Sequence, residues 1–375
     1  MATSSKKIRV LVVDDSTFMR KVLENIYNGD EQMQVVGSAK DGREAVSMAE
    51  SLKPDVISMD INMPHVDGLQ ATAEIMTTNP KPIVIVSSES KEGASSTLRA
   101  LELGAIEFVA KPSSGIDLDM QTVKDELLRK VRMAAKVRVV RTATRLASSI
   151  QNAGANAKPA AAQKATHRPP AGSAGDQRFP VVVLVASTGG PATVMRIAPG
   201  FTRDFPGAVI LVQHMPATFT SQYATQLAEF TEIRVKEAEA NEALAPGTLY
   251  ICPGGQHLRV TATGKIQLDG TSGRIAGYLP NMDVTMESVA AYAGPLSIAA
   301  ILTGMGNDGT TGARAIKNAG GLVLAQDEAT CVIFGMPAEA IEAGVVDQVV
   351  GMDDIYQAIE KRVVGICKPT PAGVR

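Results

Sequence analysis

Short apolar runs and amphipathic stretches alternate along the first third of the chain. Five runs have the length and β-branched content of strands, and they cover residues 8–15, 33–39, 55–60, 82–88 and 107–112. The stretches between them, such as 18–27 and 43–51, have the apolar spacing of helices. Strands that alternate with helices predict a parallel sheet with helices on both faces. Five strands in about 120 residues fit a flavodoxin-like α/β domain.

A second α/β pattern begins at residue 179. Buried parallel strands are expected at 179–187, 207–214, 295–304 and 321–327, and shorter strands at 247–253, 257–262 and 265–270. The last two can form a hairpin, and helices are expected at 310–318 and 338–343. The pattern predicts a second α/β domain, doubly wound around a mostly parallel sheet.

The segment between these two patterns has a different composition. Residues 117–150 are typical of a basic helix, whereas 151–178 are rich in Ala, Pro and Gly without an apolar period, as expected of a flexible or semi-extended linker. Arg129 to Arg178 contain 11 Lys and Arg against one acid. This basic stretch could bind an acidic partner or a membrane surface, but a solvated linker is the simpler interpretation. We therefore expect domains at 1–125 and 179–368, joined by 126–178.

Composition narrows the cellular context. The 375 residues are 45% hydrophobic, and no run approaches the roughly 20 apolar residues that cross a bilayer. The apolar run near the N-terminus is too short for a signal peptide. The three cysteines are widely spaced and form no CxxC pair, which argues against a zinc site or a disulfide framework. We expect a cytoplasmic protein that is not inserted in a membrane.

Charged and hydroxyl side chains follow the predicted strands of the first domain. Asp14, Asp15, Asp60, Ser87 and Lys111 stand at strand ends, and such ends meet at one edge of a parallel sheet. Converging carboxylates attract a hard cation, and we expect Mg²⁺, which could neutralise a phosphoryl group while one carboxylate attacks phosphorus. Helix capping by the aspartates and a surface role for the lysine could explain single residues, but not the whole set.

These residues lie in motifs that resemble a response-regulator receiver domain. The matching segments are VVDDS (12–16), MDINMPHVDG (59–68), VSS (86–88) and VAKP (109–112). The resemblance implies that Asp60 accepts phosphate from a histidine kinase and that Asp14 and Asp15 help to hold Mg²⁺. It also implies that Ser87 and Phe108 act as switch residues beside Lys111. A core role for the Phe108 ring remains open.

A candidate nucleophile ends the first strand of the second domain. Ser187 is followed by Thr188, Gly189 and Gly190, and this sequence predicts a tight turn from a strand into a helix. The turn would expose the hydroxyl and offer helix N-terminal amides to an oxyanion. It is close to the G-x-S-x-G elbow, although Val185 occupies the first glycine position. A phosphate-binding loop remains an alternative.

The candidate base and its partner come from two other strand ends. Of the four histidines, His214 follows a strongly apolar strand, whereas His257 precedes a short one and is expected to be structural or to border the substrate. Asp308, in a glycine-rich loop after 295–304, could orient the imidazole, or could instead cap the helix at 310–318. Asp283 and Asp327 are weaker candidates for the same role.

The second domain resembles the catalytic domain of the chemotaxis protein-glutamate methylesterase and glutamine deamidase family, the CheB family. The matching segments are VASTGGP (185–191), LVQHMP (211–216), LYICPGGQHL (249–258), YLPNMDVTMES (278–288), ILTGMGNDGTTGA (301–313) and QDEATCVIFGMP (326–337). The resemblance implies Ser187 as nucleophile, His214 as base and Asp308 as its orienter. Backbone amides near Thr188, Gly189 and Met305 would hold the oxyanion, and no cofactor is needed at this site.

The resemblance also implies a function and its partners. The expected substrates are glutamate methyl esters and glutamines of methyl-accepting chemoreceptors, at receptor arrays, with phosphorylation opening the hydrolase. A receiver-linked transcription factor is a weaker alternative because residues from 179 onward carry 13 basic against 18 acidic side chains, so no nucleic acid is expected. A nucleotide-binding module is also weaker, since the strand after the glycine turn ends in His214 rather than an acid.

Overall fold

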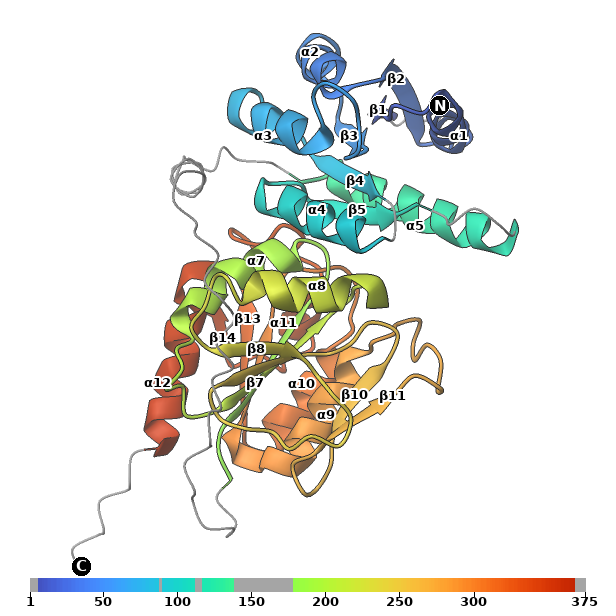
Figure 1. The fold of residues 1–375 in the computed structure, drawn as a ribbon. Helices are drawn as coiled ribbons and strands as arrows, with labels where there is room; N and C mark the ends of the chain where they lie inside the picture. Colours follow the sequence, from blue (N-terminus) through green and yellow to red (C-terminus); the bar gives the residue numbers. More distant parts are fainter. Residues whose placement is uncertain (1–5, 88–89, 112–116, 138–177, 368–375) are drawn as a thin grey trace, which may run out of the picture.

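The chain folds into two α/β units, shown in Figure 1. The structure is a computed structural model, and it describes residues 6–87, 90–111, 117–137 and 178–367. The upper unit in the figure contains the N-terminal residues, and the lower, larger unit contains residues from 178 onward. The expectation of two α/β domains is therefore confirmed.

The N-terminal unit is a five-stranded parallel sheet in the order β2-β1-β3-β4-β5. Its strands are β1 (Ile8–Val13), β2 (Met33–Ala39), β3 (Val56–Met59), β4 (Ile83–Ser87) and β5 (Glu107–Ala110). Its helices are α1 (Thr17–Asn28), α2 (Gly42–Leu52), α3 (Gly68–Thr78), α4 (Lys91–Glu102) and α5 (Asp117–Ala134). All five strands lie where the apolar runs predict them.

The C-terminal unit contains a seven-stranded sheet in the order β14-β13-β12-β6-β7-β9-β8, with parallel neighbours throughout. Its strands are β6 (Val181–Ala186), β7 (Ala208–Gln213), β8 (Arg234–Glu237), β9 (Thr248–Ile251), β12 (Ser297–Ile301), β13 (Leu322–Gln326) and β14 (Gln348–Val350). Its longer helices are α7 (Gly190–Ile197), α8 (Ala217–Leu227), α9 (Met282–Ala293), α10 (Thr310–Asn318), α11 (Met336–Glu342) and α12 (Ile355–Cys367).

Alternating side chains of the central strands form two separate cores. Val182 and Leu184 of β6 face the layer of α7, α8 and α12, whereas Val181 and Val183 face α9, α10 and α11. All four are fully buried. A strand buried on both faces needs a continuous apolar run, which explains why the run at 179–187 lacks polar alternation.

A hairpin of β10 (His257–Val260) and β11 (Ile266–Asp269) completes the C-terminal unit. Its two strands are antiparallel, as the sequence suggests. The expected linker 151–177 and the residues 138–150 of the expected basic helix lie outside the described residues. In the part of the chain that the structure describes, no helix combines the length and apolar character needed to cross a bilayer.

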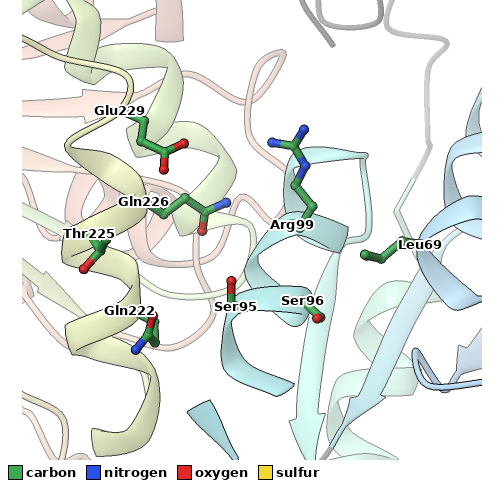
Figure 2. Close-up of a pocket in the computed structure, with 8 residues that line it drawn as sticks. All are labelled: Leu69, Ser95, Ser96, Arg99, Gln222, Thr225, Gln226 and Glu229. Atoms are coloured by element: carbon green, nitrogen blue, oxygen red, sulfur yellow. The ribbon is translucent and has the colours of Figure 1, made fainter. Parts of the chain in front are cut away.

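The two units contact each other through α4 and α8, which lie side by side in Figure 1. The Phe108 ring of β5 stacks on Phe219 of α8 with 4.4 Å between centroids. At the far end of α4, Gln226 donates a hydrogen bond to Glu102. An open cavity of about 330 Å³ lies at this interface, and its walls come from α3 and α4 on one side and residues 222–229 on the other (Figure 2).

Candidate active site and phosphoacceptor pocket

The candidate catalytic residues follow three adjacent strands at the centre of the large sheet. Ser187 follows β6, His214 follows β7, and Asp308 lies in the loop after β12. Because β12, β6 and β7 are parallel neighbours, their carboxyl ends lie side by side. The topology therefore brings together side chains that are 94 residues apart in the case of His214 and Asp308.

His214 bridges the serine and the aspartate. Its Nδ1 atom lies 3.2 Å from the Ser187 hydroxyl, and its Nε2 atom lies 2.8 Å from Oδ2 of Asp308. The aspartate is fully buried, and 15% of the histidine side chain is exposed. A buried carboxylate beside Nε2 favours the tautomer that carries its proton there, which leaves Nδ1 free to accept the serine proton.

The turn after Ser187 is held by two hydrogen bonds to the Ser187 carbonyl. Gly189 has a left-handed backbone with φ of 76°, and the amide of Gly190 donates to the Ser187 carbonyl at 2.9 Å. The side chain of Gln213 donates to the same carbonyl at 2.9 Å. Val185 is fully buried in β6, so the residue at the first elbow position belongs to the core rather than to the turn.

Asp308 is held by the amides of a helix that is not its own. The backbone N–H groups of Met282 and Asp283, in the first turn of α9, donate to its carboxylate at 2.9–3.2 Å. The residue that caps α10 is Gly309. The capping alternative for Asp308 is therefore wrong for α10, because its carboxylate binds the N-terminus of α9 instead.

The other candidate acids and histidine lie elsewhere. Asp327 accepts hydrogen bonds from Thr330, and Asp283 accepts from the amides of Gly309 and Gly312. His257 is fully buried, with Nε2 bonded to the Gly273 carbonyl and Nδ1 accepting the Asn281 amide. His257 therefore has the structural surroundings that its place before a short strand suggested.

Tyr278 closes one side of the site. Its ring stacks on the His214 imidazole with centroids 4.6 Å apart and only 9° between planes. Burial, together with the negative charge of Asp308, raises the pKa of its phenol. Met305, one of the expected oxyanion residues, is 42% exposed and follows Gly304, which packs against the Ser187 side chain.

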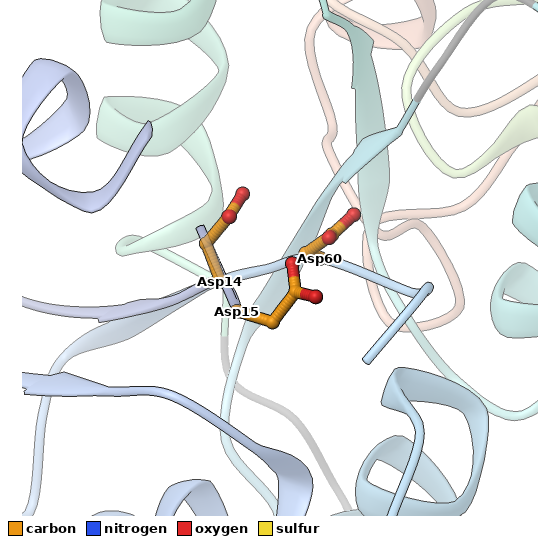
Figure 3. Close-up of side chains that lie close together, drawn as sticks. All are labelled: Asp14, Asp15 and Asp60. Carbon is orange, nitrogen blue, oxygen red and sulfur yellow. The ribbon is translucent and has the colours of Figure 1, made fainter. Parts of the chain in front are cut away.

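The three expected aspartates of the N-terminal unit form one cluster. Asp14 and Asp15 follow β1 and Asp60 follows β3, and their carboxylates converge in Figure 3. One carboxylate oxygen from each lies within 4.8 Å of the other two. Hard oxygen donors at this spacing fit a divalent cation such as Mg²⁺.

Lys111 is the counter-charge in this pocket. Its ammonium lies 2.8 Å from Asp14 and 2.9 Å from Asp60. Burial raises the pKa of Asp60, and the charge of Asp14 adds to that rise, while Lys111 opposes it. Burial alone would lower the pKa of Lys111, but the two carboxylates outweigh it and raise that pKa.

Ser87 has a hydroxyl without a hydrogen-bond partner among the described residues. It ends β4 and is 1% exposed. A buried orphan hydroxyl is costly unless a ligand completes its hydrogen bonding. Beside three carboxylates and a lysine, the missing partner fits an oxygen of a phosphoryl group.

The comparisons with known proteins match each of the two units to a family. A family model described as CheB methylesterase matches residues 182–359, and one described as response regulator receiver domain matches residues 10–122. A protein-glutamate methylesterase/protein-glutamine glutaminase of Pyrococcus horikoshii is 41% identical over 367 residues, covering 97% of this chain and 95% of that protein. A protein of the same name from Symbiobacterium thermophilum is 42% identical, covering 96% of this chain and 98% of that protein.

The chain belongs to the CheB family of protein-glutamate methylesterases/protein-glutamine glutaminases. This confirms the family expected from the sequence motifs. The crystal structure of the Thermotoga maritima CheB methylesterase catalytic domain is 42% identical, with a TM-score of 0.47, and covers 50% of this chain and 98% of that chain.

Three residues of this CheB-family site have no role assigned by sequence reasoning. Tyr278 stacks on the base, Gln213 holds the Ser187 carbonyl, and Glu107 of β5 accepts a hydrogen bond from the Thr188 hydroxyl at 2.8 Å. Tyr278 and Gln213 both lie in segments that match the family, so the motifs could have indicated them as site residues. Glu107 belongs to the other domain, and no local pattern indicates that contact.

Replacement of Gly190 tests whether the turn needs its close packing. A Cβ at this position would lie 2.2 Å from Oε1 of Gln213 and 2.7 Å from Cβ of Ala186. Gly190→Ala must shift the turn, and a displacement of about 1 Å can cost about a hundredfold in rate. We expect esterase kcat/KM to fall at least about tenfold. Thermal unfolding measured alongside reports any loss of stability.

The matched control is Gly365→Ala in α12. No atom lies within 4 Å of a Cβ at that position. Its activity and melting temperature should stay at or above those of the wild type, because alanine favours a helix over glycine. Unchanged kcat/KM for Gly190→Ala would show that the turn tolerates the shift.

Proposed function

We propose that the chain hydrolyses glutamate methyl esters of methyl-accepting chemoreceptors and deamidates glutamines in the same proteins. The observation that carries the proposal is the bridge of His214 between the Ser187 hydroxyl and the buried carboxylate of Asp308. The names of the relatives, protein-glutamate methylesterase/protein-glutamine glutaminase, support the substrate class.

The reaction begins with attack of the Ser187 oxygen on the side-chain ester carbonyl. Nδ1 of His214 takes the hydroxyl proton, and Asp308 stabilises the resulting imidazolium through Nε2. The imidazolium then donates the proton to the departing methanol, which leaves an acyl-serine. Water, deprotonated by the same imidazole, releases glutamate and restores the serine. With a primary amide the leaving group is ammonia, so deamidation follows the same path.

The oxyanion needs donors beside the nucleophile. The backbone amides of Thr188 and Gly189, at the start of α7, and those around Met305 are the candidates. Packing of Gly304 against the Ser187 side chain supports the second group, because it keeps that loop next to the nucleophile. Loss of one such donor typically costs about a hundredfold or more in rate.

Asp60 is the proposed phosphoacceptor of the receiver domain, with a histidine kinase as phosphodonor. Asp14, Asp15 and Asp60 would hold Mg²⁺, which supplies charge neutralisation for the incoming phosphoryl group. Lys111 pairs with the added charge, and the orphan hydroxyl of Ser87 donates a hydrogen bond to a phosphoryl oxygen.

The conformation described here has the receiver against the nucleophile turn. Glu107 accepts the Thr188 hydroxyl, and Phe108 stacks on Phe219. A carboxylate beside the turn disfavours a developing oxyanion. Phosphorylation at Asp60 replaces a single carboxylate charge with an acyl phosphate of about −1.5 to −2 charges and shifts the population toward an open form. Phe108 and Ser87 are the proposed switch residues.

The proposed place of action is the cytoplasmic side of chemoreceptor arrays. An enzyme of this kind acts on receptor helices without being inserted in the membrane. The domain that contains the hydrolase site carries an excess of acidic side chains, which opposes binding to nucleic acid.

Ser187→Ala tests the nucleophile. We expect methanol release from methylated receptor membranes to fall by about a thousandfold or more, because alanine has no hydroxyl beside Nδ1 of His214 to attack the ester. An activated fluorophosphonate probe should label the wild type at Ser187 and leave the variant unlabelled. Wild-type activity in Ser187→Ala would end the hydrolase assignment. Binding of phosphate without labelling would favour an anion loop.

Glu107→Ala tests the closed form. Without the carboxylate the receiver loses its hydrogen bond to Thr188, so unphosphorylated activity should rise by about fivefold or more. A phosphodonor should then activate this variant less than the wild type. Glu50→Ala, which removes an exposed glutamate of α2, is the control and should behave as the wild type. Equal unphosphorylated activity in the wild type and Glu107→Ala would contradict this role for the contact.

A further inference from the structure

Asp283 and Asp308 exchange hydrogen bonds between two helix N-termini. Asp308 accepts the amides of Met282 and Asp283 at the start of α9. In return, Oδ1 of Asp283 accepts the amide of Gly309 at 3.0 Å and that of Gly312 at 2.7 Å, at the start of α10. Asp283 of α9 therefore caps α10, while Asp308, two residues before α10, binds the first turn of α9, which Asn281 also caps.

The α10 helix depends on this outside cap. Its own capping position is Gly309, which has no side chain and makes no capping hydrogen bond. The two helices are also too close for a side chain at Gly312, where a Cβ would lie 2.5 Å from that of Met286. Asp283 thus occupies the place of an N-cap residue and ties α10 to α9.

This arrangement sets two carboxylates close together. Burial raises the pKa of Asp283, and the charge of Asp308 adds to that rise, whereas the Gly312 and Gly309 amides lower it. Like charges in a buried region destabilise the fold unless each is compensated. The amides at both helix N-termini provide that compensation.

We propose that Asp283 is a positioning residue for the hydrolase: by accepting the Gly309 and Gly312 amides it fixes the loop that aims Asp308 at His214. This inference rests on the proposed function of the Ser187 site. Gly309 directly follows Asp308, so a bond to its amide acts on the peptide that carries the orienting carboxylate. Asp283 itself bonds to α10 amides rather than to His214.

Three substitutions at one position separate the acceptor from the charge. Asp283→Asn keeps an oxygen at the same distance and removes the charge. Asp283→Glu keeps the charge but moves the oxygen by one methylene, and Asp283→Ala removes both. The full chain with a phosphodonor is assayed for kcat and KM by methanol release from methylated receptor membranes, and thermal unfolding is followed for each variant.

We expect kcat to decrease about ten- to a hundredfold in Asp283→Ala, with KM little changed, since misplacement by about 1 Å can cost a hundredfold. Asp283→Asn should retain most of the wild-type kcat, and Asp283→Glu should lie below it. The low-field proton resonance of the His214–Asp308 hydrogen bond should persist in Asp283→Asn and shift or broaden in the other two. Asp41→Ala, which removes the carboxylate cap of α2, controls for general loss of a cap.

The outcomes distinguish this inference from the function on which it rests. If Asp308→Ala keeps its activity, the proposed triad fails. If Asp308→Ala is inactive while Asp283→Ala has wild-type kcat and an unchanged resonance, only the positioning role fails. If Asp283→Ala does not fold, the other two decide: activity in Asp283→Glu above that in Asp283→Asn would show that the charge matters, and would overturn the proposal.

Discussion

The hydrogen bond between His214 and Asp308 is the interaction on which the rest of the catalytic domain depends. The aspartate is fully buried, and a buried carboxylate is unfavourable unless several donors compensate its charge. One imidazole N–H is insufficient, so the fold brings the amino end of α9 against the same carboxylate. The orientation of Asp308 toward His214 therefore requires the amino end of α9 at this position. Because Asp283 of α9 in turn caps α10, the position of α10 is tied to the same group of hydrogen bonds.

In both domains, side chains that are far apart in the sequence are brought together by the same arrangement of strands. Neighbouring parallel strands end at one edge, and each strand is followed there by one or two polar residues. In the receiver the neighbours β1 and β3 deliver the aspartates, and in the hydrolase β12, β6 and β7 deliver the acid, the nucleophile and the base. In this chain, an apolar run that stops at a polar residue therefore indicates a candidate site residue, and the sequence alone shows it.

Other features could not be predicted because they arise from tertiary packing. The helix α9 carries only two charged side chains, Asp283 and Glu287, so it lacks the strongly polar face that marks an amphipathic helix. The strands β8 and β14 are short and lie at the sheet edges, where their residues are exposed or half-buried, so they form no long apolar run. Asp308 does bind a helix N-terminus, as a capping pattern suggests, but the helix is α9 rather than the one that follows it in sequence. Local sequence cannot distinguish these two helices.

The strand β5 connects the two sites physically. Glu107 and Phe108 contact the hydrolase at one end, and Lys111, just past the other end, bonds to Asp60. One four-residue strand and the residue that follows it therefore contact both sites.

The stack of Phe108 on Phe219 contributes to the free energy that is needed to separate the two domains. Phe108 and Phe219 are almost fully buried against each other, and burying such a ring is worth about 1.5–3 kcal/mol. Separation of the domains exposes both rings unless each finds another apolar site. A signal at Asp60 can therefore open the interface only if it also changes where the Phe108 ring is buried. Phe108 can therefore be both a core residue of β5 and a switch residue.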